Sequence, residues 1–287
     1  MPSVPVPSVP VPSDPVPSDP VPSDPVPSDP VPGDPVVVTR YGGVALLVLN
    51  VPGQRNALSV PLVAAIGSAL DVLESDGVTQ CLVVTGAGRS FCAGAELSSL
   101  RAAADGEFGQ VTEVYDGFLR FLHSPLATIA AVNGAAVGAG FNLALACDVR
   151  LAGQHALFDS RFAQLRIHPG GGHAWMLTRA VGQQQAMLAC LFGEVWNASA
   201  ALAAGLVAGV YDDDELVSAA IALGRRLEDQ EPAFTRRLLS TLRQAVATAA
   251  HADALASETD AQRWSVTRPA FRDGLRAIEE QIGRRGR

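Results

Sequence analysis

Residues 90–97 read SFCAGAEL, and residues 131–140 read AVNGAAVGAG. Each stretch follows an apolar run that predicts a buried strand, and the second leads into a helix that begins near Ala139. Small side chains let a ligand approach the backbone, and free amides at the start of a helix favour negative charge. If the two loops face each other, they can direct two N–H groups at one oxygen atom.

The composition of the 287-residue chain excludes several classes of function. A net charge of −8, with no basic cluster larger than an arginine pair, argues against a nucleic-acid partner. All 21 basic residues are arginine, which excludes lysine Schiff-base chemistry and a phosphate-loop lysine. No apolar run approaches the roughly 20 residues that a membrane-spanning helix needs. We therefore expect a soluble globular protein with no membrane span.

The cysteines are Cys81, Cys92, Cys147 and Cys190, and their spacing is not that of a metal site. Three of them lie in apolar runs, where a free cysteine behaves as a small hydrophobic side chain. The N-terminus has neither the charged nor the apolar region of a secretory signal. These features predict reduced thiols, no metal and a cytoplasmic location.

Residues 1–35 differ from the rest of the chain because they repeat the five-residue pattern Val-Pro-Ser-Asp-Pro. They contain 14 of the 20 prolines, and each proline fixes φ and removes a backbone donor. We predict a disordered, polyproline-like tail. The remaining residues suffice for an α/β core over residues 36–210 and a C-terminal helical region over residues 211–287.

Strands alternate with helices through the predicted core. Apolar runs predict strands over residues 36–41, 44–50, 81–85, 127–132, 149–152 and 156–158. Helices are expected over residues 59–74, 110–122 and 139–147. After the glycines at 170–172 the pattern is almost wholly helical, with one strand near residues 207–211. This order favours a mainly parallel sheet of repeated β-β-α units.

Further motifs accompany the two glycine-rich loops in a fixed order. They are PGQRNAL at 52–58, AAVNG at 130–134, LALACD at 143–148, PGGG at 169–172, TRAVG at 178–182 and AAGLV at 203–207. Together these motifs resemble the enoyl-CoA hydratase/isomerase (crotonase) family over roughly residues 37–282. The resemblance implies a crotonase-like spiral of β-β-α units with a C-terminal helical oligomerisation region. It also implies action on acyl-CoA thioesters, and a homotrimer or a dimer of trimers.

This family stabilises a thioester enolate with two backbone amides, which the resemblance assigns to Ala95 and Ala139. Preorganised donors at such an oxyanion are commonly worth about 3–4 kcal/mol. The resemblance further implies a CoA-binding segment that comprises Arg55, Ala57, Ala93, Gly94, Glu96 and Leu97. Because CoA is part of the substrate, no separate cofactor is expected.

The chain departs from the hydratase pattern at both positions where the family places catalytic glutamates. These positions hold Asn142 and Phe162. Asparagine can orient a water molecule but cannot accept its proton, and phenylalanine can do neither. Asp159 and His168 are candidate substitutes for the missing acid and base, and His173, which begins the next helix, is another titratable residue nearby.

The sequence leaves two main classes of function open. One is an acyl-CoA enzyme, by default a hydratase-like lyase, with an isomerase, decarboxylase or thioester hydrolase as variants. The other is an acyl-CoA-binding protein that has lost catalysis, which Asn142 and Phe162 favour. Asp159 also has a purely structural interpretation, an ion pair with Arg161.

Overall fold

The computed structural model describes residues 33–107, 109–245, 259–260, 264 and 268–269 of the chain. The proline-rich tail therefore lies outside the described residues except for its last three positions. The end of the predicted C-terminal region lies outside them as well, so both boundaries, at 35 and at 210, stay predictions.

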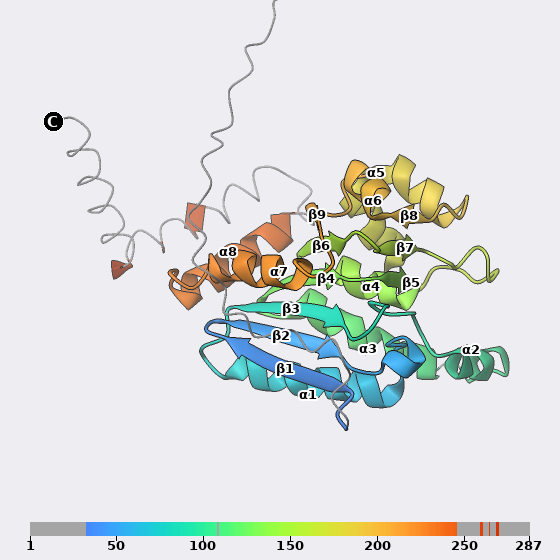
Figure 1. Cartoon of the computed structure of the whole chain (residues 1–287), viewed down its shortest axis with the longest axis horizontal. Helices are drawn as coiled ribbons and strands as arrows, with labels where there is room; N and C mark the ends of the chain where they lie inside the picture. The colour runs from blue at the N-terminus through green and yellow to red at the C-terminus, as the bar shows by residue number, and fades with distance from the viewer. Residues whose placement is uncertain (1–32, 108, 246–258, 261–263, 265–267, 270–287) are drawn as a thin grey trace, which may run out of the picture.

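A six-stranded sheet with the order β1-β2-β3-β4-β6-β9 forms the centre of the fold (Figure 1). Its strands are β1 (Val36–Tyr41), β2 (Val44–Leu49), β3 (Cys81–Gly86), β4 (Ala127–Val132), β6 (Val149–Gly153) and β9 (Gly209–Tyr211). The first two strands form an antiparallel hairpin, and every later pair in the sheet is parallel. The predicted, mainly parallel α/β arrangement is confirmed.

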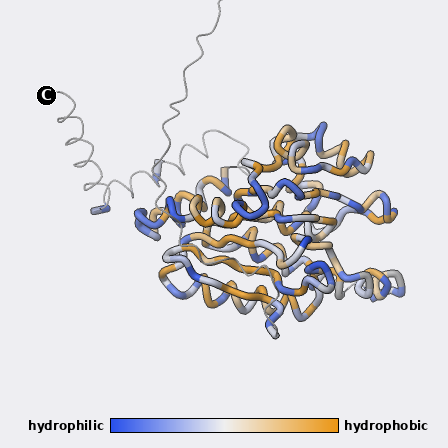
Figure 2. The backbone as a smooth tube through the Cα atoms, viewed as in Figure 1, coloured by the Kyte–Doolittle hydropathy of each residue, from blue (hydrophilic) through white to orange (hydrophobic). Residues whose placement is uncertain are grey.

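Helices cover both faces of this sheet (Figure 1). The helices on one face are α1 (Val60–Ser75), α3 (Gly109–His123) and α4 (Ala139–Ala146), and α7 (Leu216–Arg225) covers the other. Each face has its own hydrophobic core. In β2, Leu47 lies in the core beneath α1, α3 and α4, and its neighbour Leu46 lies in the core beneath α7. Strands buried on both faces are apolar throughout, and Figure 2 shows the hydrophobic colour along them.

Local sequence explains where the first long helix begins. Ser59 precedes α1, and its Oγ accepts a hydrogen bond from Leu62 N at 3.3 Å. Such a cap satisfies one of the amide groups that the start of a helix leaves unpaired. Pro61 lies in the first turn, where its missing N–H costs nothing. The helix predicted from Ser59 onward is confirmed.

A second, three-stranded sheet lies beside α5 and α6 (Figure 1). Its strands are β5 (Ala135–Val137), β7 (Leu157–Asp159) and β8 (Trp196–Asn197), and the neighbouring helices are α5 (His173–Cys190) and α6 (Ala198–Ala203). The expectation of a single strand after residue 172 is wrong, because β8 also pairs there. With two residues, β8 is too short to produce a periodic pattern.

The remaining elements are η1 (Pro52–Gln54), α2 (Leu97–Ala104) and α8 (Pro232–Ala245). Asp148, the last residue of the LALACD motif, links α8 to β4 by hydrogen bonds. Its carboxylate accepts hydrogen bonds from Arg243 at 2.7 and 2.8 Å and from Thr128 N and Oγ1 at 2.8 Å. Among the described helices, none combines the length and the apolar character needed to cross a membrane.

Candidate functional site

The two glycine-rich loops lie directly against each other. Cys92 N donates to Ala135 O, and Val137 N donates to Cys92 O, both at 3.0 Å. A Cβ atom on Gly140 would overlap Cys92 O, and one on Gly94 would lie 2.7 Å from Val137 O. Gly94 also has a φ of +98°, which disfavours any side chain. Glycine at these two positions is therefore what allows the loops to meet.

Two amides at this junction, those of Ala95 and Ala139, donate to no backbone acceptor among the described residues. Leu58 bridges to Ala95 through Gly94 O and Glu96 N, so the N–H of Ala95 faces the opposite side of the chain. Ala139 is the first residue of α4, where an N–H has no acceptor within the helix. A Cβ atom on Gly94 would lie only 3.6 Å from Ala139 N. This arrangement suits a single anionic oxygen bound between two donors.

Both alanines line one cavity of about 860 Å³, a volume typical of small-molecule sites. The residues that the sequence analysis singled out and that line it are Arg55, Ala57, Ala93, Gly94, Ala95, Glu96, Ala139, Asn142, Phe162 and His168. Leu97 begins α2. The loops thus bring all of the expected CoA-binding positions except Leu97 together with Asn142 and Phe162.

The PGQRNAL motif joins the wall of this cavity to the first glycine-rich loop. Asn56 is buried, and its Nδ2 donates to Ser90 O at 2.8 Å and to Ala87 O at 3.0 Å. Ala93 N donates to Arg55 O at 3.0 Å, while the side chain of Arg55 is exposed. The guanidinium group is therefore available to a phosphate of a bound ligand.

The two proposed substitutes for the glutamates have different surroundings. Asp159 is buried, and Arg161 Nε donates to its Oδ2 at 2.8 Å. This carboxylate is engaged in the ion pair that the sequence analysis gave as its structural interpretation. His168 is exposed on the cavity wall, and its Nδ1 lies 2.8 Å from Pro169 O. Of the two, His168 is the more accessible to a ligand.

Asn142 belongs to a buried hydrogen-bond chain that the sequence analysis did not identify. Its Oδ1 lies 2.6 Å from His173 Nδ1, and His173 Nε2 lies 2.8 Å from Ser160 Oγ. Burial lowers the pKa of His173 to about 4, so the imidazole is neutral at pH 7. The ring of Phe162 packs on His173 with 5.0 Å between centroids. The sequence around Ser160 contains no motif or spacing that predicts its hydrogen bond to His173.

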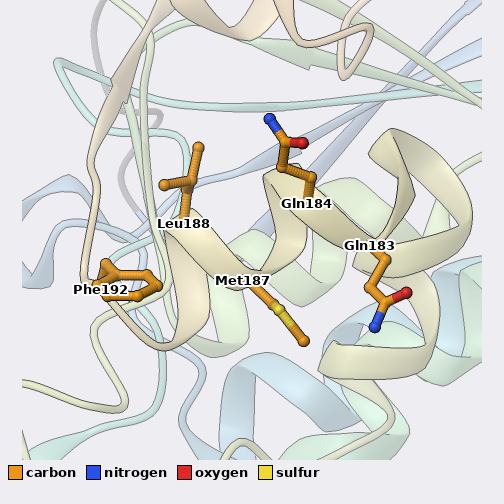
Figure 3. Close-up of a pocket in the computed structure, with 5 residues that line it drawn as sticks. All are labelled: Gln183, Gln184, Met187, Leu188 and Phe192. Carbon is orange, nitrogen blue, oxygen red and sulfur yellow. The ribbon is translucent and has the colours of Figure 1, made fainter.

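A second hollow, of about 430 Å³, lies along the C-terminal half of α5 and the loop after it (Figure 3). Its lining residues are Gln183, Gln184, Met187, Leu188 and Phe192. None of these five side chains titrates, so this hollow offers no acid or base. Phe192 is 74% exposed.

Comparison with known proteins identifies the family. The family model for enoyl-CoA hydratase/isomerase matches residues 39–283. The chain belongs to this family. It is therefore a crotonase-family enzyme that acts on acyl-CoA, and both the family and the crotonase fold expected from the sequence are confirmed.

Three relatives illustrate the similarity of this crotonase-family chain to known proteins. The "Probable enoyl-CoA hydratase echA14" of Mycobacterium tuberculosis is 50% identical over 182 residues, which are 63% of this chain and 71% of the relative. The 1,2-epoxyphenylacetyl-CoA isomerase of Escherichia coli is 34% identical over 241 residues, 82% of this chain and 92% of the relative. The solved enoyl-CoA hydratase of Bacillus anthracis has a TM-score of 0.81 at 27% identity, and the match covers 86% of this chain and 97% of that one.

Proposed function

We propose that the protein binds an acyl-CoA thioester in the 860 Å³ cavity and stabilises negative charge on the thioester oxygen with the amides of Ala95 and Ala139. The observation that supports this is the junction of the two loops, which brings two outward-directed amides into one cavity wall. Charge develops on this oxygen as an enolate forms, and preorganised donors act there without reorganisation. CoA is part of the substrate in this proposal, and no separate cofactor takes part.

The reaction that we propose uses the same oxyanion site as the hydratase lyases, but it is not ordinary hydration of crotonyl-CoA. Hydration needs one group that takes a proton from water and one that exchanges a proton with the substrate. Asn142 already donates to Gly170 O at 3.1 Å and accepts from His173, and Phe162 has no polar atom. The amide and the ring cannot perform the proton transfers of two glutamates.

Binding of acyl-CoA tests the proposal directly. At a concentration one hundred times its dissociation constant, a ligand stabilises the folded state by about 2.7 kcal/mol. We expect acetyl-, octanoyl- or palmitoyl-CoA to raise the melting temperature of the full chain by several degrees. No shift with any of the three would refute the assignment of the cavity to acyl-CoA.

A second candidate is an acyl-CoA-binding protein without catalysis, which is favoured by Asn142 and Phe162 at the glutamate positions. It predicts the same thermal shift but no change in the bound thioester. Incubation of equimolar protein with each acyl-CoA, followed by mass spectrometry of the products, separates the two candidates. Any protein-dependent product excludes the binding-only function.

We also propose a homotrimer or a dimer of trimers in the cytoplasm. Phe192, which lines the hollow on α5, is 74% exposed, and its neighbour Leu191 is 68% exposed. Large apolar side chains gathered on a surface are typical of a contact, here with a second copy of the chain. The four free cysteines are consistent with a reducing compartment. Light scattering of the purified chain tests the assembly.

A further inference from the structure

Three buried side chains from different parts of the fold form one hydrogen-bonded line. Ser160 follows β7, His173 begins α5, and Asn142 lies within α4. Their exposed fractions are 2%, 0% and 1%. Hydrogen bonds this far from water contribute strongly to structure or chemistry only when donors and acceptors match throughout.

The direction of each hydrogen bond follows from the carbonyl group of Gly170. Because a carbonyl oxygen only accepts, Asn142 must present Nδ2 to Gly170 O and Oδ1 to His173. The proton of the neutral imidazole is therefore on Nδ1, which donates to Oδ1 at 2.6 Å. Nε2 is then the free acceptor. The hydroxyl of Ser160 has two neighbours that could accept its proton, His173 Nε2 at 2.8 Å and Cys190 Sγ at 3.6 Å, and the shorter contact to the stronger acceptor assigns the proton to Nε2.

This order of hydroxyl, imidazole and amide oxygen is the order that activates a serine nucleophile. The base lies within hydrogen-bonding distance of the hydroxyl, and a third group holds the base in the tautomer that can accept a proton. Burial keeps His173 in its neutral form, because it lowers the pKa of the imidazole to about 4. Nε2 therefore carries no proton at neutral pH and can accept one from Ser160. The same burial disfavours the imidazolium, so the Asn142 oxygen and the negative charge formed on the thioester oxygen must stabilise that cation during the transfer.

Ser160 and Ala139 lie on neighbouring segments of the cavity wall. Val137 of β5 pairs with Asp159 of β7, and Gly138 N donates to Asp159 O at 2.9 Å. The residues that follow this pair, Gly138 and Ser160, therefore lie opposite each other, and Ala139 comes directly after Gly138. Ser160 and Ala139 both line the 860 Å³ cavity.

The chain turns sharply just after Ser160. Phe162 N donates to Ser160 O at 2.7 Å, and the intervening Arg161 has a φ of +59°. Left-handed backbone is uncommon outside glycine and is concentrated at functional sites. The turn leaves Ser160 directly after β7, on the wall of the cavity.

We propose that Ser160 is a catalytic nucleophile for acyl-CoA thioesters, with His173 as its base and Asn142 as a positioning residue, so that this cavity hydrolyses thioesters. The inference rests on the proposed function, because the amides of Ala95 and Ala139 hold the thioester oxygen. It adds a reaction class and two residues, Ser160 and His173, that take the place of the missing glutamates.

The reaction uses only the thioester and water. Ser160 Oγ forms a bond to the carbonyl carbon while its proton passes to His173 Nε2, and the C=O electron pair moves to the oxygen. When the carbonyl re-forms, the carbon–sulfur bond breaks, and the sulfur takes the electron pair and the proton from Nε2, so CoA leaves as a thiol. Water then attacks the acyl-serine, its proton passes through Nε2 to Ser160 Oγ, and the carboxylic acid leaves.

The test follows the release of CoA and carboxylic acid from acetyl-, octanoyl- and palmitoyl-CoA with the full chain. Ser160→Ala and His173→Gln should each lower the release by at least about a thousandfold. Ser124→Ala is the matched control, because it removes another buried serine hydroxyl that does not line the cavity. The Oγ of Ser124 accepts a hydrogen bond from Leu126 N at 3.2 Å. Release that is absent in the unchanged chain, or undiminished by Ser160→Ala, overturns the proposal.

Two further measurements keep the test decisive if Ser160→Ala does not fold. Ser160→Cys keeps a nucleophile, so intact-mass and peptide analysis should find one acyl group at position 160. Asn142→Asp should raise the pKa of His173 by placing a carboxylate against Nδ1, which moves the acidic limb of the kcat profile to higher pH. An unmodified position 160 or an unmoved profile contradicts the assigned roles.

Thermal shifts with the same acyl-CoAs separate this inference from the proposed function. If acyl-CoA stabilises the fold but no CoA is released, only the nucleophile fails. If acyl-CoA neither stabilises the fold nor is cleaved, the cavity itself is wrongly assigned and both fail.

Discussion

The cavity has a backbone half and a side-chain half, and the two are held by different means. The amides of Ala95 and Ala139 are held by the packing of two loops, which depends on glycine at positions 94 and 140. In the other half, Ser160, His173 and Asn142 are held by hydrogen bonds to one another. A backbone donor persists whatever its side chain is, whereas each member of the line is lost with one substitution. The second half can therefore change its chemistry while the first stays intact.

The largest expected effect is on the rate of ordinary hydration, for which the backbone half is intact and the side-chain half lacks both carboxylates. Because neither Asn142 nor Phe162 supplies a carboxylate, crotonyl-CoA hydration should be at least about a thousandfold slower than in a working hydratase. Asn142→Glu combined with Phe162→Glu should raise the rate, since the amides are still in place. A spectrophotometric hydration assay measures both. Rapid hydration by the unchanged chain would contradict this and point to His168 or Asp159 as the base.

Removal of one amide tests the backbone half alone. Ala139→Pro should lower kcat/KM for the acyl-CoA that the protein converts by about 10²–10³-fold, because proline has no N–H. The melting temperature should change little, since proline is tolerated at the first position of a helix. Val60→Pro makes the same change at the exposed first residue of α1 and should leave kcat/KM unaltered. Equal activity of both variants would show that the Ala139 amide takes no part.

Loop packing should respond strongly to one methyl group. Gly140→Ala should lower the free energy of unfolding by about 3 kcal/mol, because its Cβ atom overlaps the carbonyl group of Cys92. For a chain of this size that is roughly 6–12 °C in melting temperature. Gly53→Ala is the control, since no atom lies within 4 Å of its added Cβ. Similar melting temperatures for both variants would show that the loops are not as tightly packed as described.

The side-chain half should make the free energy of unfolding depend on pH in the acidic range. An unfolded histidine has a pKa of about 6.5, and burial lowers that of His173 to about 4. Below pH 6.5 the unfolded state therefore binds a proton that the folded state does not. As the pH is lowered, the free energy of unfolding decreases. Between pH 7 and pH 5 the loss should be about 2 kcal/mol. Denaturant unfolding of His173→Gln should lack this component; identical losses in both proteins would contradict a buried neutral His173.

The smallest effect should come from deletion of the proline-rich tail. Deletion of residues 2–32 should shift the melting temperature by less than about 2 °C and leave acyl-CoA binding unchanged. The deletion keeps Asp34 O and Pro35 O, which accept hydrogen bonds from Asn50 at 2.8 Å. A longer deletion, of residues 2–36, removes both and should cost more. A fall of 10 °C with the shorter deletion would show that the tail packs on the core.

Much of the fold could be predicted because its signals are local. The apolar runs of β2, β3 and β4 occupy consecutive residues, and Ser59 marks the start of α1 where it caps the helix. The strands β5 and β8 were not predicted. β5 lies within the small-residue stretch AVNGAAVGAG and β8 has only two residues, and both gain their stability from partners far along the chain.

The sequence by itself determined the family, the order of the main elements and the loops of the backbone half, because ordered motifs and glycines act through neighbouring residues. Only the tertiary structure decided that Ser160, His173 and Asn142 form one line, since they are 13 and 31 positions apart along its two hydrogen bonds. It alone also decided the direction of that line. The carbonyl of Gly170, another 28 positions from Asn142, orients the amide and with it the imidazole proton. Such matching of donors to acceptors depends on positions in space, which spacing along the chain does not contain.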